Sequence, residues 1–179
     1  ISLKKLLAGV LSAAMVLTSM ALPVFADEST NGNAAKIGET EYETLTAAVA
    51  AVKDGETVTM LKNVTESVEI AADKNITIDL NGKTLTNTDG KHTIENNGTL
   101  MINDSSNDKT GTVDNVIHAR GALVNHAGAV ATLNGGKFYR SLEAGNSPDN
   151  NGGNSWYTIL NQGTMTINDG ATVENSGCY

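Results

Sequence analysis

The residues of this chain that are best suited to acid–base chemistry lie close together at Asp114, His118 and Arg120. His118 and Arg120 are two residues apart, so a β-strand would place both side chains on one face. A carboxylate beside a strong base could serve a polysaccharide lyase, and paired carboxylates could serve a glycoside hydrolase. A surface turn made of ordinary polar residues explains the same pattern and is favoured. The sequence leaves enzyme activity open and favours a role without catalysis.

Two aromatic pairs offer a different chemistry, the binding of a carbohydrate. An exposed ring can stack on a sugar face while neighbouring amides bind hydroxyl groups. The pairs stand on either side of a segment rich in Gly, Asn and Ser, residues 141–155. The predicted ligand-binding residues are Phe138, Tyr139, Trp156 and Tyr157. The alternative is that these rings pack the inserted segment onto the rest of the fold.

No metal site and no cofactor are predicted. Asp104 and Asp108 lie at a spacing that could suit calcium, but Lys109 stands where an EF-hand loop needs glycine and Asn115 where it needs glutamate. A solvated turn is the preferred interpretation of this segment. His92 and His126 do not have metal-ligand spacing.

The elements that would position these residues are short strands related by an internal repeat. The phrase Gly98–Asp104 (GTLMIND) returns as Gly163–Asp169 (GTMTIND) and, in degenerate form, as Ala129–Gly135 (AVATLNG). Each copy alternates apolar and polar residues and then reaches Asn followed by Asp or Gly, which signals a turn. Repetition at tens of residues is typical of a solenoid.

The spacing of apolar residues predicts coils of about 22 residues. Val58, Leu80, Ile102 and Val124 follow one another at this constant interval, and the stretch from Ile102 to Ile167 would hold about three such coils. Asparagines at equivalent turns are predicted to stack on each other, namely Asn81, Asn103, Asn134 and Asn168. An antiparallel β-sandwich is the rival architecture.

One helix is predicted near residues 44–53. Leu45, Ala48, Val49 and Val52 form a single apolar face, and Thr44 can cap the N-terminal end. Because a helix of about three turns is marginal alone, we expect it to cover the first coil.

The N-terminal segment 1–26 reads as a secretory signal peptide, with Lys4 and Lys5, an apolar stretch and the sequence Val24-Phe25-Ala26 before the cleavage point. A membrane-spanning helix is the alternative. Cleavage would leave a leader at 27–35 and a single β-domain at 36–179 with no membrane span.

The chain that remains after cleavage is acidic. Two of the 12 basic residues leave with the signal peptide, so 10 remain against 20 acidic ones. Because acidic residues outnumber basic ones, we do not expect nucleic acid as a partner.

The segments around Ile37–Leu45, Gly55–Leu61, Ile76–Leu85 and Asn97–Ile102 resemble the start of exported bacterial surface proteins. Those proteins carry a β-helix of the pectate-lyase-like superfamily, which includes lyases, polygalacturonases, tailspikes and adhesin-like proteins. The resemblance covers residues 36–179 and implies an all-β fold, a right-handed, single-stranded parallel β-helix with a capping helix. We also expect the chain to be the N-terminal fragment of a longer protein, because it begins with Ile1 where Met is expected and ends soon after the strand-like segment Ala171–Val173 with no cap.

The expected function is therefore a secreted or cell-surface module that binds a polysaccharide or another glycan without catalysis. A polysaccharide lyase or glycoside hydrolase of the β-helix class is one alternative. The other is a structural spacer that carries a distal domain. Fold alone does not choose among them.

Overall fold

The computed structural model describes residues 32–117, 119–141 and 157–175. The predicted signal peptide lies outside these residues. The described chain forms strands throughout, apart from one helix, α1 (Leu45–Ala51). Within these ranges no helix has the length and apolar character needed to cross a membrane.

The strands form three sheets, which we call A, B and C. Sheet A contains, in spatial order, β15 (Thr164–Ile167), β12 (Val130–Leu133), β9 (Thr99–Asn103), β6 (Asn75–Asp79), β3 (Thr57–Met60), β1 (Ala35–Ile37) and β2 (Thr40–Tyr42). Sheet B contains β16 (Ala171–Asn175), β13 (Gly136–Arg140), β10 (Thr112–Asp114), β7 (Thr84–Thr86) and β4 (Val64–Thr65). Sheet C contains β14 (Ile159–Asn161), β11 (Leu123–Asn125), β8 (Ile94–Asn96) and β5 (Val68–Ile70).

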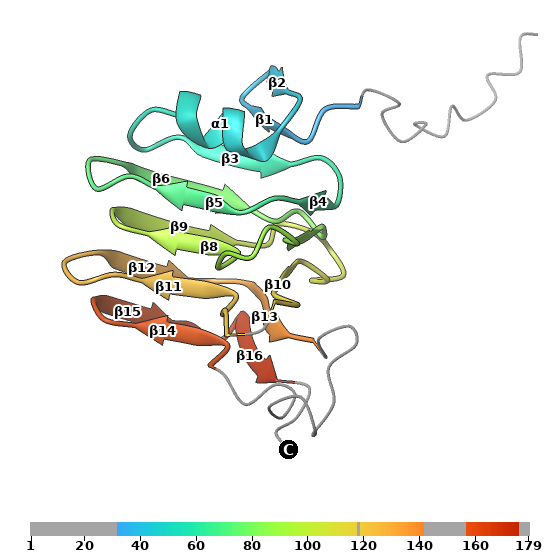
Figure 1. Cartoon of the computed structure of the whole chain (residues 1–179). Helices are drawn as coiled ribbons and strands as arrows, with labels where there is room; N and C mark the ends of the chain where they lie inside the picture. The colour runs from blue at the N-terminus through green and yellow to red at the C-terminus, as the bar shows by residue number, and fades with distance from the viewer. Residues whose placement is uncertain (1–31, 118, 142–156, 176–179) are drawn as a thin grey trace, which may run out of the picture. The chain divides into compact units, whose positions relative to one another are not determined.

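From β3 onward the chain visits the three sheets in turn, and from β6 onward each strand pairs in parallel with the strand one passage earlier. We call one passage through A, B and C a coil; Figure 1 shows successive coils side by side along each sheet. Among the described strands only β1 pairs antiparallel, with β2 and β3. This arrangement confirms an all-β chain with mostly parallel sheets, consistent with a β-helix-like fold, and contradicts the antiparallel sandwich.

In most strands every second residue fills the interior, as the alternating burial of β3, β6, β9 and β13 shows. In sheet A, Val58, Ile78, Ile102 and Leu133 occupy the same register position in successive coils, and all four are fully buried. Like side chains therefore lie above one another, each covering the apolar surface of its neighbour.

The coils are unequal in length, and the constant spacing predicted from the sequence is wrong. The register partners in sheet A are Val58, Ile78, Ile102, Leu133 and Ile167, so the interval lengthens from each coil to the next. The stretch from Ile102 to Ile167 therefore holds two coils rather than three. The strands keep their register while the turns between them absorb the extra residues, so regular spacing was a misleading signal.

Two members of the predicted series do not belong to it. Leu80 lies just after β6, and Val124 belongs to sheet C. Both are buried, but neither is a register partner of Ile102.

Asparagine side chains stack at two corners of the coils. Asn134 donates to Asn103 at 3.0 Å, and Asn168 donates to Asn134 at 2.6 Å, which confirms three of the four predicted positions. Asn81 is the exception, since it has a positive φ of 47° and donates to the Met60 carbonyl instead. Its register-equivalent position in β6 is taken by Asp79, which pairs with Asn103.

A second asparagine series at the end of the sheet C strands was not predicted. Asn96 donates to Asn125 at 2.7 Å, and Asn125 donates to Asn161 at 2.8 Å. Asn96 and Asn125 are fully buried, and their amides also bond to carbonyl oxygens of Val130 and Thr164. These amides satisfy backbone groups where the chain turns from sheet C to sheet A.

Helix α1 contacts β1, β2, β3 and β5 and covers one end of the coils (Figure 1), as predicted. The Thr44 hydroxyl accepts the Ala47 N–H at 3.1 Å, so the predicted cap is confirmed. The Glu66 carboxylate accepts the N–H groups of Leu45 and Thr46 and adds negative charge at the positive helix end. Ala34 and Ala35 are buried, so the folded part begins within the leader predicted at 27–35.

Candidate functional site

The outer face of sheet C brings two glutamates side by side. In β5, Val68 and Ile70 point into the core and Glu69 points outward; in β8, Ile94 and Glu95 repeat the pattern. Glu69 and Glu95 are register partners on adjacent parallel strands. Strand alternation therefore places both carboxylates on the same surface, about one strand spacing (~4.8 Å) apart at their Cα atoms.

The two glutamates line a cleft of about 210 Å³. Helix α1 contributes Thr46, β5 contributes Val68 together with the preceding Ser67, and the segment entering β8 contributes Lys91 and His92. The lining carries hydroxyl, carboxylate, ammonium and imidazole groups, which together offer both donors and acceptors. The cleft can therefore bind a polar ligand that is rich in hydroxyl groups.

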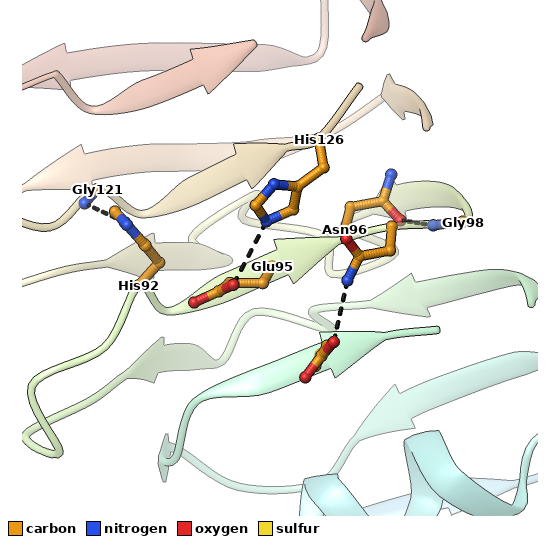
Figure 2. A network of polar contacts seen from close by, with 8 residues as sticks. His92, Glu95, Asn96, Gly98, Gly121 and His126 are labelled. Carbon is orange, nitrogen blue, oxygen red and sulfur yellow. Dashed lines mark hydrogen bonds and ion pairs between the residues drawn. The ribbon is translucent and has the colours of Figure 1, made fainter. Parts of the chain in front are cut away.

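Neighbouring side chains hold the two carboxylates in place. The His126 Nε2 atom lies 3.4 Å from Glu95 Oε2, and Asn97 Nδ2 donates to Glu69 Oε1 at 3.0 Å. Figure 2 shows His126 directed toward Glu95 from the neighbouring coil. The bond to Asn97 holds Glu69 on its outward face beside β8.

His92 connects the cleft to the next coil. Its Nδ1 accepts the Gly121 N–H at 2.9 Å (Figure 2), and its ring stacks on Tyr157 with centroids 6.1 Å apart and planes inclined by 19°. Burial lowers the pKa of His92, and the nearby charge of Arg120 lowers it further, while Glu95 opposes the shift. Neutral His92 is therefore the favoured form in this position.

Two hydroxyl-bearing residues of the cleft, Thr46 and Ser67, donate hydrogen bonds to carboxylates that are not part of its lining. The Ser67 hydroxyl donates to Asp89 at 2.5 Å and lowers the pKa of that carboxyl. The Thr46 hydroxyl donates to Glu66 at 2.7 Å. Both hydroxyls line the cleft and are oriented by these carboxylates.

The predicted catalytic group is not assembled among the described residues. Asp114 lies on the outer face of β10, and its two oxygens accept the N–H and hydroxyl of Ser141 at 2.9 and 2.7 Å. The Arg120 guanidinium donates to the carbonyls of Gly90 and Ala119 instead. His118 lies outside the described residues. The structure thus shows Asp114 and Arg120 stabilising separate turns.

The four predicted aromatic residues have different surroundings. Phe138 is 0% exposed in the core, so its prediction as a ligand contact is wrong, because alternation in β13 turns its ring inward. Tyr139 points outward from sheet B, with Lys137 Nζ 4.0 Å from its ring centroid. Tyr157 stacks on His92 beside the cleft. Trp156 lies outside the described residues.

The turn first compared with a calcium loop is organised by hydrogen bonds. Asp104 accepts the N–H groups of Gly82 and Gly111 at 2.9 and 2.7 Å, and the Ser106 hydroxyl at 2.7 Å. Its oxygens are therefore used by the chain itself. In the described ranges, no three His, Cys, Asp or Glu side chains are grouped so that they could hold a metal ion.

Sequence reasoning missed Glu69 and Glu95, and treated His92 as an isolated histidine. A usable signal was present, since Val68-Glu69-Ile70 and Ile94-Glu95-Asn96 place a glutamate between inward residues in successive coils. The signal was concealed because the interval between the two glutamates differs from the constant coil length that the apolar residues predicted.

No known protein family matches the chain, and no curated protein or solved structure is significantly similar to it. The function is therefore argued from the geometry of the cleft.

Proposed function

We propose that this protein is an exported, cell-surface or secreted β-helix module that binds a polysaccharide or another glycan in the cleft on sheet C. The proposal includes the finer features expected from sequence, a right-handed β-helix of the pectate-lyase-like type and a cleaved signal peptide at 1–26. The observation that carries the binding site is the in-register pair Glu69 and Glu95 in a cleft that is also lined by His92, whose ring stacks on Tyr157.

These groups are complementary to a sugar. Carboxylate oxygens accept hydrogen bonds from hydroxyl groups, and charge-assisted bonds of this kind are stronger than neutral ones. A tyrosine ring offers an apolar face on which the C–H side of a sugar can stack. Lys91 adds a donor to the cleft, and the hydroxyl oxygens of Thr46 and Ser67, whose protons are donated to Glu66 and Asp89, add acceptors.

Glycan-array binding by the secreted chain, followed by titration of the glycan that binds, tests the proposal. Glu95→Gln and Tyr157→Ala are each expected to weaken binding by about tenfold, or about 1.4 kcal/mol. Tyr139→Ala is the matched control, because that ring lies on sheet B. Equal loss in all three variants, or no loss in the two cleft variants, would contradict this site.

A second function, glycoside hydrolysis, is favoured by one specific observation. Glu69 and Glu95 lie on adjacent strands, and retaining glycosidases hold two carboxyl groups about 5–5.5 Å apart. Incubation with soluble polysaccharides would then release reducing ends, and Glu69→Gln and Glu95→Gln would each abolish the release. Binding with no release of reducing ends would support the non-catalytic function.

A further inference from the structure

The hydrogen bond between His92 and Gly121 depends on the protonation state of His92. The Gly121 N–H donates to Nδ1 at 2.9 Å, so this nitrogen carries no proton and the neutral ring holds its proton on Nε2. Adding a proton can occur only at Nδ1, and it converts the acceptor into a donor that faces another donor. The bond cannot survive protonation.

We propose that protonation of His92 in mildly acidic solution breaks its bond to Gly121 and releases the ring of Tyr157 from its stack on His92, which lines the cleft. The opening would follow from the geometry of three residues in consecutive coils. It makes the cleft on sheet C a pH-sensitive site.

Tyr157 is involved because its ring packs on the Gly121 backbone. A Cβ atom at Gly121 would lie 3.0 Å from Tyr157 Cδ2 and 3.0 Å from the Thr158 carbonyl oxygen. Gly121 is buried, and the same tyrosine ring stacks on His92. Water can therefore replace the lost acceptor only if Tyr157 moves, since an unpaired buried N–H is costly.

Charged groups face His92 from several neighbouring elements. Glu95 on β8 attracts the imidazolium, whereas Arg120 before β11 and His126 after it repel it. Lys91 precedes His92 in the chain, and Glu69 on β5 lines the same cleft. Arg120 is the residue before Gly121, so its repulsion acts on the segment that protonation would release.

The sign of the pH effect follows from burial. The closed form binds a proton on His92 less tightly than an open form, because burial lowers the pKa of the imidazole. The open form would titrate near the ordinary histidine value of about 6.5. Opening therefore increases as the pH falls below that value and is suppressed above it.

Other bonds limit how far the segment can move. Arg120 Nε donates to the Gly90 carbonyl at 2.9 Å, and the Gly121 carbonyl accepts the Thr93 N–H at 3.2 Å. Neither bond depends on the state of His92. The change is thus confined to the Gly121 N–H and the Tyr157 ring, and the coils stay in register.

Hydrogen exchange of the Gly121 amide, followed by NMR near pH 7.5 and pH 5, tests the opening without any ligand. After correction for intrinsic exchange, we expect the Gly121 protection factor to fall by about tenfold or more at the lower pH. The Thr77 amide is the internal control, because it donates to the Glu56 carbonyl in a part of the chain that contains no histidine. An unchanged Gly121 protection factor would overturn the proposal.

Two variants sharpen the test. His92→Asn places an amide oxygen near the position of Nδ1 and does not titrate, so Gly121 protection should be high at both pH values. His92→Phe has no acceptor and should give low protection at both. An equal acid-induced loss in His92→Asn would overturn the proposal. If a variant fails to fold, the wild-type chain still decides, because the Gly121 change must share its midpoint with the NMR titration of the His92 ring.

The consequence for ligand binding rests on the proposed function. If a glycan occupies the cleft, its affinity should fall at pH 5 in the wild-type chain and stay constant in His92→Asn. The exchange experiment separates the two ideas. A pH-dependent Gly121 amide with no glycan binding would support the opening and contradict the proposed function, whereas glycan binding with a pH-independent amide would contradict the opening alone.

Discussion

Two copies of one short phrase, Gly98–Asp104 and Gly163–Asp169, share their sequence pattern and differ in their burial. Ile102 is 0% exposed, whereas Ile167 in the second copy is 50% exposed. Asp104 is buried, and Asp169 is exposed. Both isoleucines are register partners of Leu133, so both stand on the same inward position of sheet A.

The difference lies in the neighbours of each coil. The first copy forms β9, which lies between β6 and β12, while the second forms β15, which pairs with β12 at one end of sheet A. A strand in a stack is covered on two sides by adjacent coils, and an end strand on one. Contacts with the preceding coil should therefore contribute equally to the free energy of unfolding in the two copies. Contacts with the following coil should account for the difference between the copies.

The largest difference between the two copies is expected for the isoleucines, in the free energy of unfolding that each loses on substitution by alanine. Ile102→Ala should lower the free energy of unfolding by about 3–4 kcal/mol, because it leaves a cavity in a fully covered interior. Ile167→Ala should cost about 1 kcal/mol or less, since half of that side chain is already in water. Urea unfolding followed by circular dichroism measures both. Equal costs would mean that β15 is covered in solution as well as β9.

The second largest difference is expected for the two aspartates, again in the free energy of unfolding lost on substitution by alanine. Burial by itself would raise the pKa of Asp104, but hydrogen bonds from the Ser106 hydroxyl and from Gly82, Gly111 and Ser106 N–H groups lower it below its ordinary value. Asp104→Ala should cost about 2–3 kcal/mol, and Asp169→Ala less than about 0.5 kcal/mol. Urea unfolding near neutral pH measures both costs.

The same carboxylate predicts a pH dependence. A folded-state pKa below the unfolded value means that the stabilisation is complete above about pH 4–5 and is lost as the pH falls through the folded pKa. The wild-type chain should therefore lose stability as the pH falls through this range. Asp104→Ala should lose less over that range, as measured by urea unfolding at a series of pH values. Parallel acid profiles in the wild-type chain and Asp104→Ala would contradict this assignment.

The smallest difference between the two copies is expected for the glycines, in the local stability lost on substitution by alanine. A Cβ at Gly98 would lie 2.4 Å from the Ala71 carbonyl oxygen, and one at Gly163 would lie 2.3 Å from the Ala129 carbonyl oxygen. Each clash is with the preceding coil, so Gly98→Ala and Gly163→Ala should each cost about 1–3 kcal/mol locally. Hydrogen exchange of the amides in β9 and β15 measures the local effect. A harmless Gly163→Ala would show that β15 does not pack closely on β12.

Several features of the fold could be predicted from the sequence, because they depend on local patterns. Alternation of apolar and polar residues identified the strands, and Thr44 followed by the apolar face from Leu45 identified α1. The stacked asparagines 103, 134 and 168 followed from the repeated turn. Asn81 was misplaced because it was aligned by a constant interval, whereas the register sets Asp79 beside Asn103.

The candidate site was predicted less well. Tyr157 lies beside the cleft, but Phe138 points into the core, and the side chains of Asp114 and Arg120 are used in separate turns. The cleft residues Glu69 and Glu95 belong to different coils and become neighbours only through the register of β5 and β8. That register depends on the length of the turns, which alternation within one strand does not report.

The amino-acid sequence by itself determined which residues form strands, which side of each strand is apolar and where the covering helix begins, because these properties arise within a few neighbouring residues. The tertiary structure alone decided which strands lie next to each other, how many residues each coil contains, and whether a repeated phrase is buried or exposed. These properties depend on interstrand hydrogen bonds and side-chain packing between coils. They therefore require the assembled stack.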